Sequence, residues 1–141
     1  MTSPENTSQT INIEEKIGIR IANYDDTSFI YATWLRSLYY GNPWYRMIDK
    51  DTFFDKYKLV VSNLLDNSTV AIACLKNDPE VIVGYAVLTN KRLHYVYVKE
   101  AWRKLGIAKL IIPDNIESVS HLTSLGAKIK PKNWTFNPFL D

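Results

Sequence analysis

The sequence predicts one domain of the α+β class, built on a mixed but mostly antiparallel sheet that is flanked by helices. Its length of 141 residues is typical of a single domain. Apolar residues recur at helical spacing in the first half of the chain, and three strand-like runs then follow one another directly. The resulting order is β-α-α-β-β-β-α-β with a short end, which is typical of an α+β fold with a mixed sheet.

A polar tail and one strand begin the chain. Residues 1 to 12 contain few large apolar groups, so we expect a flexible tail ahead of a single domain over 13 to 141. Apolar and polar residues alternate over 16 to 21, which predicts a half-buried strand. Its buried face would carry Ile17, Ile19 and Ile21.

Two helices are predicted next. An N-capping aspartate within 23 to 26 predicts a helix over 27 to 40, which the Gly-Asn-Pro run at 41 to 43 would end. Asp49 or Asp51 can cap the second helix. The apolar residues expected on its buried face are Phe53, Tyr57, Val60, Val61 and Leu64.

Three strands in the middle of the chain are predicted to form an antiparallel meander over 69 to 75, 81 to 89 and 93 to 98. The first is a continuous apolar run, which suits a strand buried on both faces. Its Cys74 is expected to be a small buried hydrophobic side chain. Gly84 in the second strand indicates a bulge or a close approach of two backbones.

The C-terminal part is predicted to hold a basic loop with Gly106, a short helix that ends at Pro113, and a strand over 119 to 122. Residues 124 to 132 favour one helical turn. Residues 134 to 139 favour an edge strand, because a proline within them cannot donate to a central ladder.

Composition and charge exclude several classes of protein. The chain has no run of 18 apolar residues and no secretory signal at its start, so we expect a cytoplasmic protein with no membrane partner. A single cysteine excludes an internal disulfide, and no spacing typical of a metal site is present. A net charge of +2 is too small to favour nucleic acid as a partner. We expect a solvated face or an anion contact at Lys128, Lys130 and Lys132.

The stretch that is most informative about chemistry runs from a strand through a basic loop into a helix. Over 98 to 108 its sequence is VKEAWRKLGIA. The N-terminus of a helix leaves backbone N–H groups unpaired, and such a loop can therefore bind a phosphate or pyrophosphate. Gly106 and Ala108 would let a ligand approach the backbone closely. Positive charge would come from Lys99, Arg103, Lys104 and Lys109.

This stretch resembles the cofactor-binding motif of the GCN5-related N-acetyltransferase (GNAT) family, in which a strand ending in Val leads to an aromatic residue and Arg/Gln-x-x-Gly-x-Gly/Ala. The matching residues are Val98, Trp102, Arg103, Gly106 and Ala108. The chain departs from the pattern at Glu100, where Pro is common. The order of elements over 17 to 112 also fits the family. The first helix, SFIYATWLRSLYY at 28 to 40, also resembles GNAT-like proteins of tailed phages.

The resemblance implies that the chain binds acetyl-CoA or another acyl-CoA as a co-substrate. Backbone N–H groups of the loop would hold the pyrophosphate, and the strand before it would pair with the pantetheine arm like an added strand. The residues implied in this binding are Val96, Val98, Arg103, Lys104, Leu105, Gly106, Ile107 and Ala108. An amine acceptor would attack the thioester directly, and a primary amine must first lose a proton because it is largely protonated at pH 7.

The sequence departs from the family at the acid that protonates the departing thiolate, commonly a Tyr of the fourth helix. One alignment matches the family's Pro-Asp-Asn to Tyr-x-x-Leu-Gly pattern to 113 to 126 and places Leu122 at the Tyr position. The other takes 107 to 112 as the third helix and 119 to 122 as the fifth strand, which leaves the fourth helix largely missing. In both alignments the acid Tyr is absent and the C-terminal region is truncated relative to the family.

Two histidines are the candidate catalytic residues. His94 lies on the predicted cofactor strand, where it can act as a base, and His121 lies on the strand expected beside it. By alternation Tyr95 and Tyr97 lie on the face opposite His94, as core or cleft-lining aromatic residues. The aromatic and basic segment 42 to 46 would, in this fold, overhang the acceptor site.

The leading hypothesis is a GNAT-type N-acyltransferase that moves an acetyl group from acetyl-CoA to an amine acceptor, either a small molecule or a protein. The alternative is a non-catalytic GNAT-fold binding protein, for which the missing Tyr argues. With the phage likeness, it would be a factor that acts on a host protein in the host cytoplasm. A GNAT relative that modifies DNA bases is a third hypothesis, and the mild charge counts against it. Exposed sheet edge on the C-terminal side would favour a homodimer.

Overall fold

The computed structural model describes residues 13 to 121 and 133 to 137, and it contains one six-stranded sheet. The strands are β1 (Ile17–Ile21), β2 (Thr69–Leu75), β3 (Asp78–Thr89), β4 (Arg92–Val98), β5 (Ser118–Val119) and β6 (Thr135–Phe136), in that order across the sheet. The pairs from β1 to β4 are antiparallel, and β4–β5 and β5–β6 are parallel. The helices are α2 (Ile13–Lys16), α3 (Thr27–Gly41), α4 (Lys50–Asp66) and α5 (Ile107–Ile111), with short 3-10 turns at η1 (Tyr24–Asp26), η2 (Tyr45–Met47) and η3 (Glu100–Trp102). The predicted α+β class with a mixed, mostly antiparallel sheet is confirmed.

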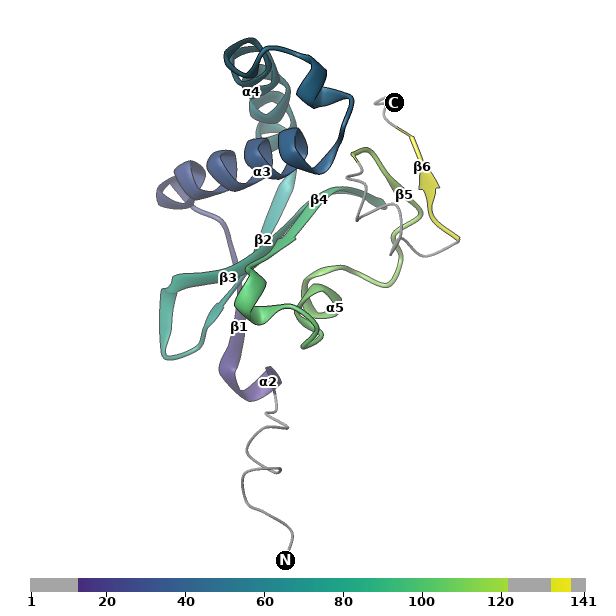
Figure 1. Ribbon diagram of the computed structural model, residues 1–141. Coiled ribbons are helices and arrows are strands. Elements are labelled where there is room, and N and C mark those ends of the chain that lie inside the picture. Colours follow the sequence, from purple (N-terminus) through teal and green to yellow (C-terminus); the bar gives the residue numbers. More distant parts are fainter. Residues whose placement is uncertain (1–12, 122–132, 138–141) are drawn as a thin grey trace, which may run out of the picture.

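The helices cover the two faces of the sheet unequally. Figure 1 shows α3 and α4 together on one side of the strands and the shorter α5 on the other. The core under α3 and α4 is rich in rings such as Trp34, Phe53 and Tyr85, which are almost fully buried. The core under α5 consists mainly of Ile, Val, Leu and Ala. We call these two sides the aromatic face and the aliphatic face.

Helix α4 begins where the sequence predicts. The carboxylate of Asp49 accepts the backbone N–H of Thr52 and so caps the helix. The expected burial is confirmed for Phe53, Val61 and Leu64. It is wrong for Val60, which is 39% exposed because it lies at a cavity of the aromatic face rather than in the core.

Strand β1 is less buried than the alternation of its residues predicts. Ile17 is buried, but Ile19 and Ile21 are 50% and 65% exposed. The reason is the short reach of α5, which packs mainly on β2, β3 and β4 and leaves this edge strand uncovered along most of its length. The prediction that the three isoleucines share one buried face is therefore wrong.

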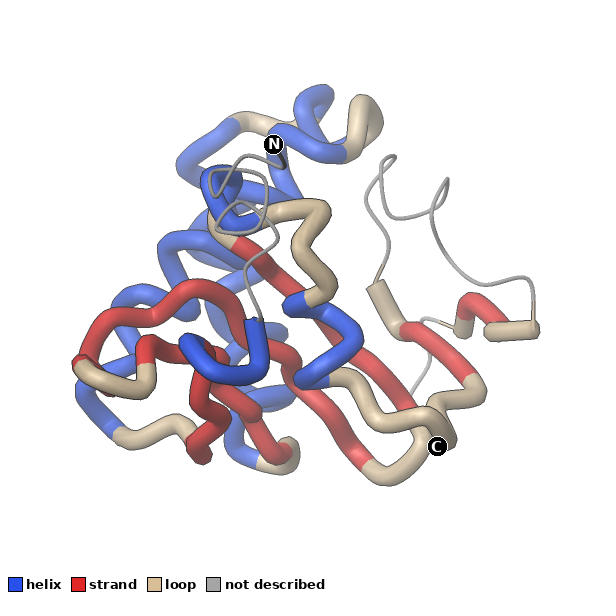
Figure 2. The backbone as a smooth tube through the Cα atoms, turned by 90° about the horizontal axis from the view of Figure 1, so that it is seen from below, coloured by secondary structure: helices blue, strands red, loops and turns tan. Residues whose placement is uncertain are grey.

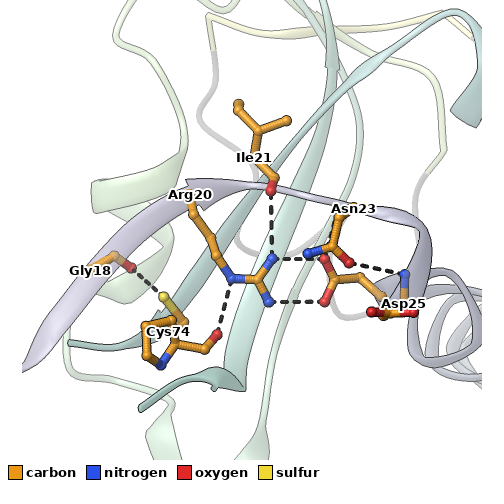
Figure 3. Close-up of polar contacts among 8 residues, drawn as sticks. Gly18, Arg20, Ile21, Asn23, Asp25 and Cys74 are labelled. Atoms are coloured by element: carbon orange, nitrogen blue, oxygen red, sulfur yellow. Dashed lines mark hydrogen bonds and ion pairs between the residues drawn. The ribbon is translucent and has the colours of Figure 1, made fainter. Parts of the chain in front are cut away.

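The aspartate expected to cap α3 has another partner. Asp26 makes no side-chain capping bond to α3; it accepts from the Arg20 guanidinium instead, Nη1 to Oδ2 at 2.7 Å and Nη2 to Oδ1 at 2.9 Å. It also accepts the backbone N–H of Asn23, and Figure 3 shows Arg20 and Asn23 converging at this point. The Arg20 hydrogen bonds hold the pKa of Asp26 below its usual value. The pair ties the end of β1 to the start of α3.

The central meander is confirmed, and Gly84 marks the close approach that the sequence predicts. A Cβ at this position would lie 2.5 Å from the carbonyl oxygen of Tyr97 on β4. Cys74 is 3% exposed, and its thiol donates to the carbonyl of Gly18 at 3.5 Å, which confirms the expected burial. Any side chain at Gly84 would push β3 and β4 apart.

A bulge that the sequence did not predict interrupts the pairing of β3 with β4. Val87 lies opposite Tyr95, but Leu88 lies opposite Leu93, so His94 is an extra residue on β4. The bulge breaks the alternation of side chains along the strand. It therefore places His94 at the level where β5 joins the sheet.

The C-terminal elements follow the second of the two alignments, because a short helix leads to a strand that lies parallel to β4. That strand is shorter than predicted, and β6 forms the edge of the sheet beyond it, as the backbone view in Figure 2 shows. The predictions for 1 to 12, for 124 to 132 with its three lysines, and for Leu122 lie outside the described residues. In the described ranges no helix is both long and apolar enough to cross a membrane. The cytoplasmic location and the homodimer stay predictions.

Candidate functional site

The sheet opens between β4 and β5, and this opening organises the site. The two strands pair at Arg92 and Leu93 of β4, and the backbone N–H of Ser120 still donates to the Leu93 carbonyl at 3.1 Å. Beyond this point β4 continues to Val98, whereas the pairing with β5 has ended. Half of β4 thus presents a strand edge with no neighbouring strand among the described residues.

The free edge of β4 exposes backbone groups of Val96 and Val98, two of the predicted cofactor-binding residues. The Lys99 N–H donates to the Val83 carbonyl, so the register directs the N–H and C=O of Val96 and Val98 away from β3. The Val98 carbonyl accepts from Nε of Arg103 at 2.8 Å. No described residue bonds to the N–H or C=O of Val96. An extended ligand can pair with the edge there as an added strand would.

The basic loop after β4 has a sharply turned backbone and is open to solvent. Lys104 and Gly106 both have positive φ, +65° and +86°, so the backbone turns sharply at both positions. The space above Gly106 is open, because a Cβ built there would meet no atom within 4 Å. Arg103, Lys104 and Leu105 are exposed, whereas Ile107 is buried in the aliphatic face and offers its backbone alone.

The two predicted histidines are brought together by a serine that bridges them. Ser120 Oγ lies 2.7 Å from Nδ1 of His94 and 2.8 Å from Nδ1 of His121. Nε2 of His94 lies 2.9 Å from Oγ1 of Thr89, which in turn lies 3.0 Å from Oγ of Ser68. These five side chains form one continuous chain of hydrogen bonds, which we call the histidine chain.

The histidine chain can carry a proton without moving a heavy atom. A serine hydroxyl has one proton, so Ser120 donates to one ring while it accepts from the other. In one arrangement His121 is protonated at Nδ1 and its Nε2 is a free base; in the other His121 is protonated at Nε2. A proton taken up at Nε2 switches the chain from the first arrangement to the second and passes a proton through His94 toward Thr89.

Burial keeps both rings uncharged at neutral pH. It lowers the pKa of His121 to about 4, with a smaller contribution from His94. It likewise lowers the pKa of His94 to about 4, with a smaller contribution from the charge of Arg92. The rings therefore act as hydrogen-bonding groups and weak bases at pH 7 and carry no positive charge.

A cavity of about 430 Å³ opens on the aromatic face beside the histidine chain. Its lining residues come from α3, from the loop before α4, from α4 and from the β5–β6 region: Leu38, Trp44, Tyr45, Tyr57, Val60, Asn63, Leu64, Ser120, His121 and Phe136. Leu38, Leu64 and Ser120 are buried, whereas Trp44, Val60 and Phe136 are 56%, 39% and 50% exposed, so a floor and a mouth can be distinguished. The volume lies in the range of small-molecule sites. Segment 42 to 46 contributes two aromatic walls.

The tyrosines of β4 lie on the aromatic face but outside the cavity lining. Tyr95 stacks on Trp34 at 5.1 Å between ring centroids, and burial raises its pKa to about 12. Tyr97 packs edge-on against Phe29. Trp34, on which Tyr95 stacks, also meets the His121 ring edge-on at 6.0 Å and so helps to hold the imidazole in place.

Sequence reasoning missed two parts of the site. Thr89 and Ser68 lie on other elements than the histidines, and their role depends on the bulge at His94. Tyr57 was expected as a core residue; its hydroxyl lies 3.3 Å from that of Tyr45 at the cavity wall. Helical spacing signals an apolar face and does not show whether that face meets a core or a cavity. In the described part of the chain, no three His, Cys, Asp or Glu side chains are grouped to hold a metal.

Comparisons with known proteins give partial likenesses of fold. No protein-family model matches the chain, and no curated protein matches its sequence. A possible acetyltransferase from Clostridium difficile 630 is 17% identical, with a TM-score of 0.47 over 67% of this chain and 65% of that chain. YjaB from Escherichia coli, solved in its apo form, is 17% identical, with a TM-score of 0.45 over 67% and 60%. The yncA protein from Salmonella typhimurium, solved with acetyl-CoA as its cofactor, is 20% identical, with a TM-score of 0.43 over 68% and 58%.

Each match covers less than two thirds of the solved chain. At these identities and TM-scores the likenesses establish neither a family nor an activity for this chain. The likeness to phage proteins stays a prediction.

Proposed function

We propose that the chain is an N-acyltransferase that transfers an acetyl group from acetyl-CoA to an amine acceptor. The observation that carries the proposal is the free edge of β4 at Val96 and Val98. On one side it leads into the loop of Arg103 and Gly106, and beside its other end lies the histidine chain with the cavity. A long thioester and a small acceptor can meet at such an opening.

The loop and the free edge fit the two parts of an acyl-CoA. The exposed, tightly turned backbone around Lys104 and Gly106, with the charges of Arg103 and Lys104, would bind the pyrophosphate through its N–H groups. The amide-containing pantetheine arm can bond to Val96 and to the N–H of Val98. Arg103 has a second role, because its bond to the Val98 carbonyl holds the loop against the strand.

The histidine chain would accept the proton that the acceptor nitrogen loses in the reaction. The acceptor nitrogen forms a bond to the thioester carbon, the C–S bond breaks, and sulfur leaves as the thiolate. Nε2 of His121 takes the proton from nitrogen, and the chain through Ser120 and His94 disperses it. An alkyl thiol has a pKa of about 8.5, so the thiolate leaves without a dedicated acid and takes up a proton afterwards.

Thermal unfolding with and without acetyl-CoA tests the proposal. A ligand at 100 times its Kd stabilises a protein by roughly 2.7 kcal/mol, which is about 5–10 °C for a domain of this size. Gly106→Asp should abolish the shift by placing a negative charge at the pyrophosphate. Gly106→Asn adds a side chain of the same size as Asp without its charge, and Asn also tolerates positive φ, so the difference between the two variants measures the effect of the charge alone. CoA release with an amine, measured with a thiol reagent, then tests the transfer. Absence of a shift at millimolar acetyl-CoA would refute the proposal.

A non-catalytic binding protein is the second candidate function. It is favoured by the lack of a strong base at the cavity. None of the described lining residues is an acid, and the His121 imidazole is a weak base. Such a protein would bind acetyl-CoA or a partner without releasing CoA. Stabilisation by acetyl-CoA with no CoA release for any amine would support it over the enzyme.

A further inference from the structure

We infer that the acceptor is a flat, apolar amine that is uncharged at neutral pH, an aromatic amine rather than an alkylammonium. The inference rests on the proposed function and specifies its acceptor from the cavity on the aromatic face. Three features of the structure carry it: the shape and chemistry of the walls, the absence of a carboxylate from the described lining, and the position of His121.

The walls suit a planar apolar molecule. Trp44, Tyr45, Tyr57 and Phe136 supply aromatic surface, and Leu38, Val60 and Leu64 fill the gaps between them. The polar groups of the described lining are few: the Asn63 amide, the hydroxyls of the Tyr45–Tyr57 pair, and the Ser120–His121 end of the histidine chain. A cavity of about 430 Å³ with this lining holds a ring of one or two cycles and offers one polar corner.

Among the described residues of the lining, a charged amine would find no counter-ion. No Asp or Glu is among the described residues that line the cavity. Transfer of an ammonium ion from water into a site without a paired charge is costly, whereas a neutral aromatic amine loses little hydration.

The position of His121 suits the single proton that an aromatic amine has to lose during the reaction. An aromatic amine is a free base at pH 7 and attacks without prior deprotonation. Once its nitrogen has bonded to the thioester carbon it becomes strongly acidic, so a weak base suffices to remove the proton. Nε2 of His121, to which no described residue bonds, can take that proton while Ser120 supports Nδ1 at 2.8 Å. An alkylammonium with a pKa of about 10 would need a far stronger base.

Two isomeric amines of equal size but different charge at pH 7 test the inference. p-Toluidine and benzylamine have the same formula and the same ring, but benzylamine is protonated at pH 7 and p-toluidine is not. Dissociation constants from NMR titration of the full chain at pH 7 should favour p-toluidine by roughly tenfold or more. Above the pKa of benzylamine the difference should largely disappear.

A pair of substitutions on α4 locates the binding. Val60→Trp places a large ring at the mouth of the cavity and should weaken p-toluidine binding by roughly tenfold. Leu59→Trp makes the same change at the next residue, which is 65% exposed and outside the lining, and should leave binding unchanged. Because both positions are exposed, both variants should fold.

Defined results overturn the inference. Tighter or equal binding of benzylamine at pH 7 would show that the aromatic walls act as a cage for a cation. Failure of p-toluidine to bind, or equal binding by Val60→Trp, would remove the cavity as its site. Acetyl-CoA binding with CoA release for benzylamine alone would refute this inference and leave the proposed function standing. If the chain binds p-toluidine but not acetyl-CoA, the proposed function is refuted, whereas the preference of the cavity for a neutral aromatic amine is supported.

Discussion

The aromatic and the aliphatic face of the sheet are built from different side chains. On the aromatic face, large rings meet at angles between 5° and 88° and keep polar atoms among them, such as the hydroxyl of Tyr85 with Thr33 at 2.6 Å. On the aliphatic face, branched chains of α5 such as Ile107 and Ile111 pack on β2, β3 and β4. The cavity and the histidine chain lie with the rings, and the basic loop leads into α5.

The difference shows how a small sheet can serve two ligands. Aromatic rings that meet at many different angles leave a cavity between them, with a few polar groups at its wall. A site for a small acceptor needs both features. Aliphatic chains such as Ile107 and Ile111 pack on the strands and so hold the start of α5 and the backbone of the loop in front of it. The opening between β4 and β5 joins the two sides.

The largest effect is expected when the aromatic face loses its central ring. Trp34 is fully buried, stacks on Tyr95 and contacts His121 edge-on. Trp34→Ala should lower the free energy of unfolding by about 3–5 kcal/mol, measured by urea denaturation. Ile107→Val on the aliphatic face should cost about 0.5–1.5 kcal/mol. A loss below about 2 kcal/mol for Trp34→Ala would show that the neighbouring rings close the space, and would contradict the central place of Trp34 on the aromatic face.

Acid should destabilise the aromatic face first. The folded pKa values of His94 and His121, about 4, lie below the unfolded value of 6.5, so the unfolded chain binds more protons in between. Stability should therefore fall as pH falls from about 6.5 to about 4, by at most about 3 kcal/mol per ring. His121→Gln should flatten this part of the profile of unfolding midpoint against pH. Asp26, whose pKa is lowered, loses its contribution only at still lower pH. An unfolding midpoint of the wild type that does not change between pH 6.5 and 4 would contradict this prediction.

Close contact of β3 with β4 gives the next effect. Gly84→Ala puts a methyl group against the Tyr97 carbonyl and should cost about 1–3 kcal/mol. Gly18→Ala is the matched control on β1, because its Cβ would approach no closer than 3.4 Å, to the flexible side chain of Lys76. Since the displaced strand is the one proposed to pair with pantetheine, Gly84→Ala should also weaken acetyl-CoA binding. Equal stability of the two variants would show that the sheet absorbs the methyl group.

The smallest effect is expected at the surface beside the β4–β5 junction. Nζ of Lys91 lies 3.2 Å from Oε2 of Glu117, but the two side chains are 60% and 69% exposed. Water screens such a pair, so Glu117→Gln should change the free energy of unfolding by less than about 0.5 kcal/mol. A loss above about 1 kcal/mol would mean that this ion pair, rather than the backbone bond from Glu117 to Lys91, holds the junction.

The sequence predicted those features that depend on local pattern. The continuous apolar run with β-branched residues at 69 to 75 predicted β2, the run LHYVYV at 93 to 98 predicted β4, and Gly84 predicted the close backbone contact. The strand, basic loop and short helix around Gly106 also follow from local pattern. Each of these signals is contained within a few neighbouring residues.

Features set by distant partners could not be predicted in this way. The exposure of Ile19 depends on how far α5 reaches, and α5 lies about 90 residues later in the chain. The bulge at His94 is a property of the β3–β4 register, and Ser120, which lies between the two imidazole rings, comes 26 residues after His94. Asp26 had the position of a helix cap, but a guanidinium from β1 competes for its carboxylate.

The central claim is that backbone N–H groups along the β4 edge and the loop after it bind an acyl-CoA. A ¹H–¹⁵N NMR titration with acetyl-CoA observes these groups one by one. We expect saturable shifts at the amides of Val96, Val98 and residues 104 to 108, with smaller changes on β1. No shift at these amides at millimolar acetyl-CoA, or shifts confined to other parts of the chain, would contradict it.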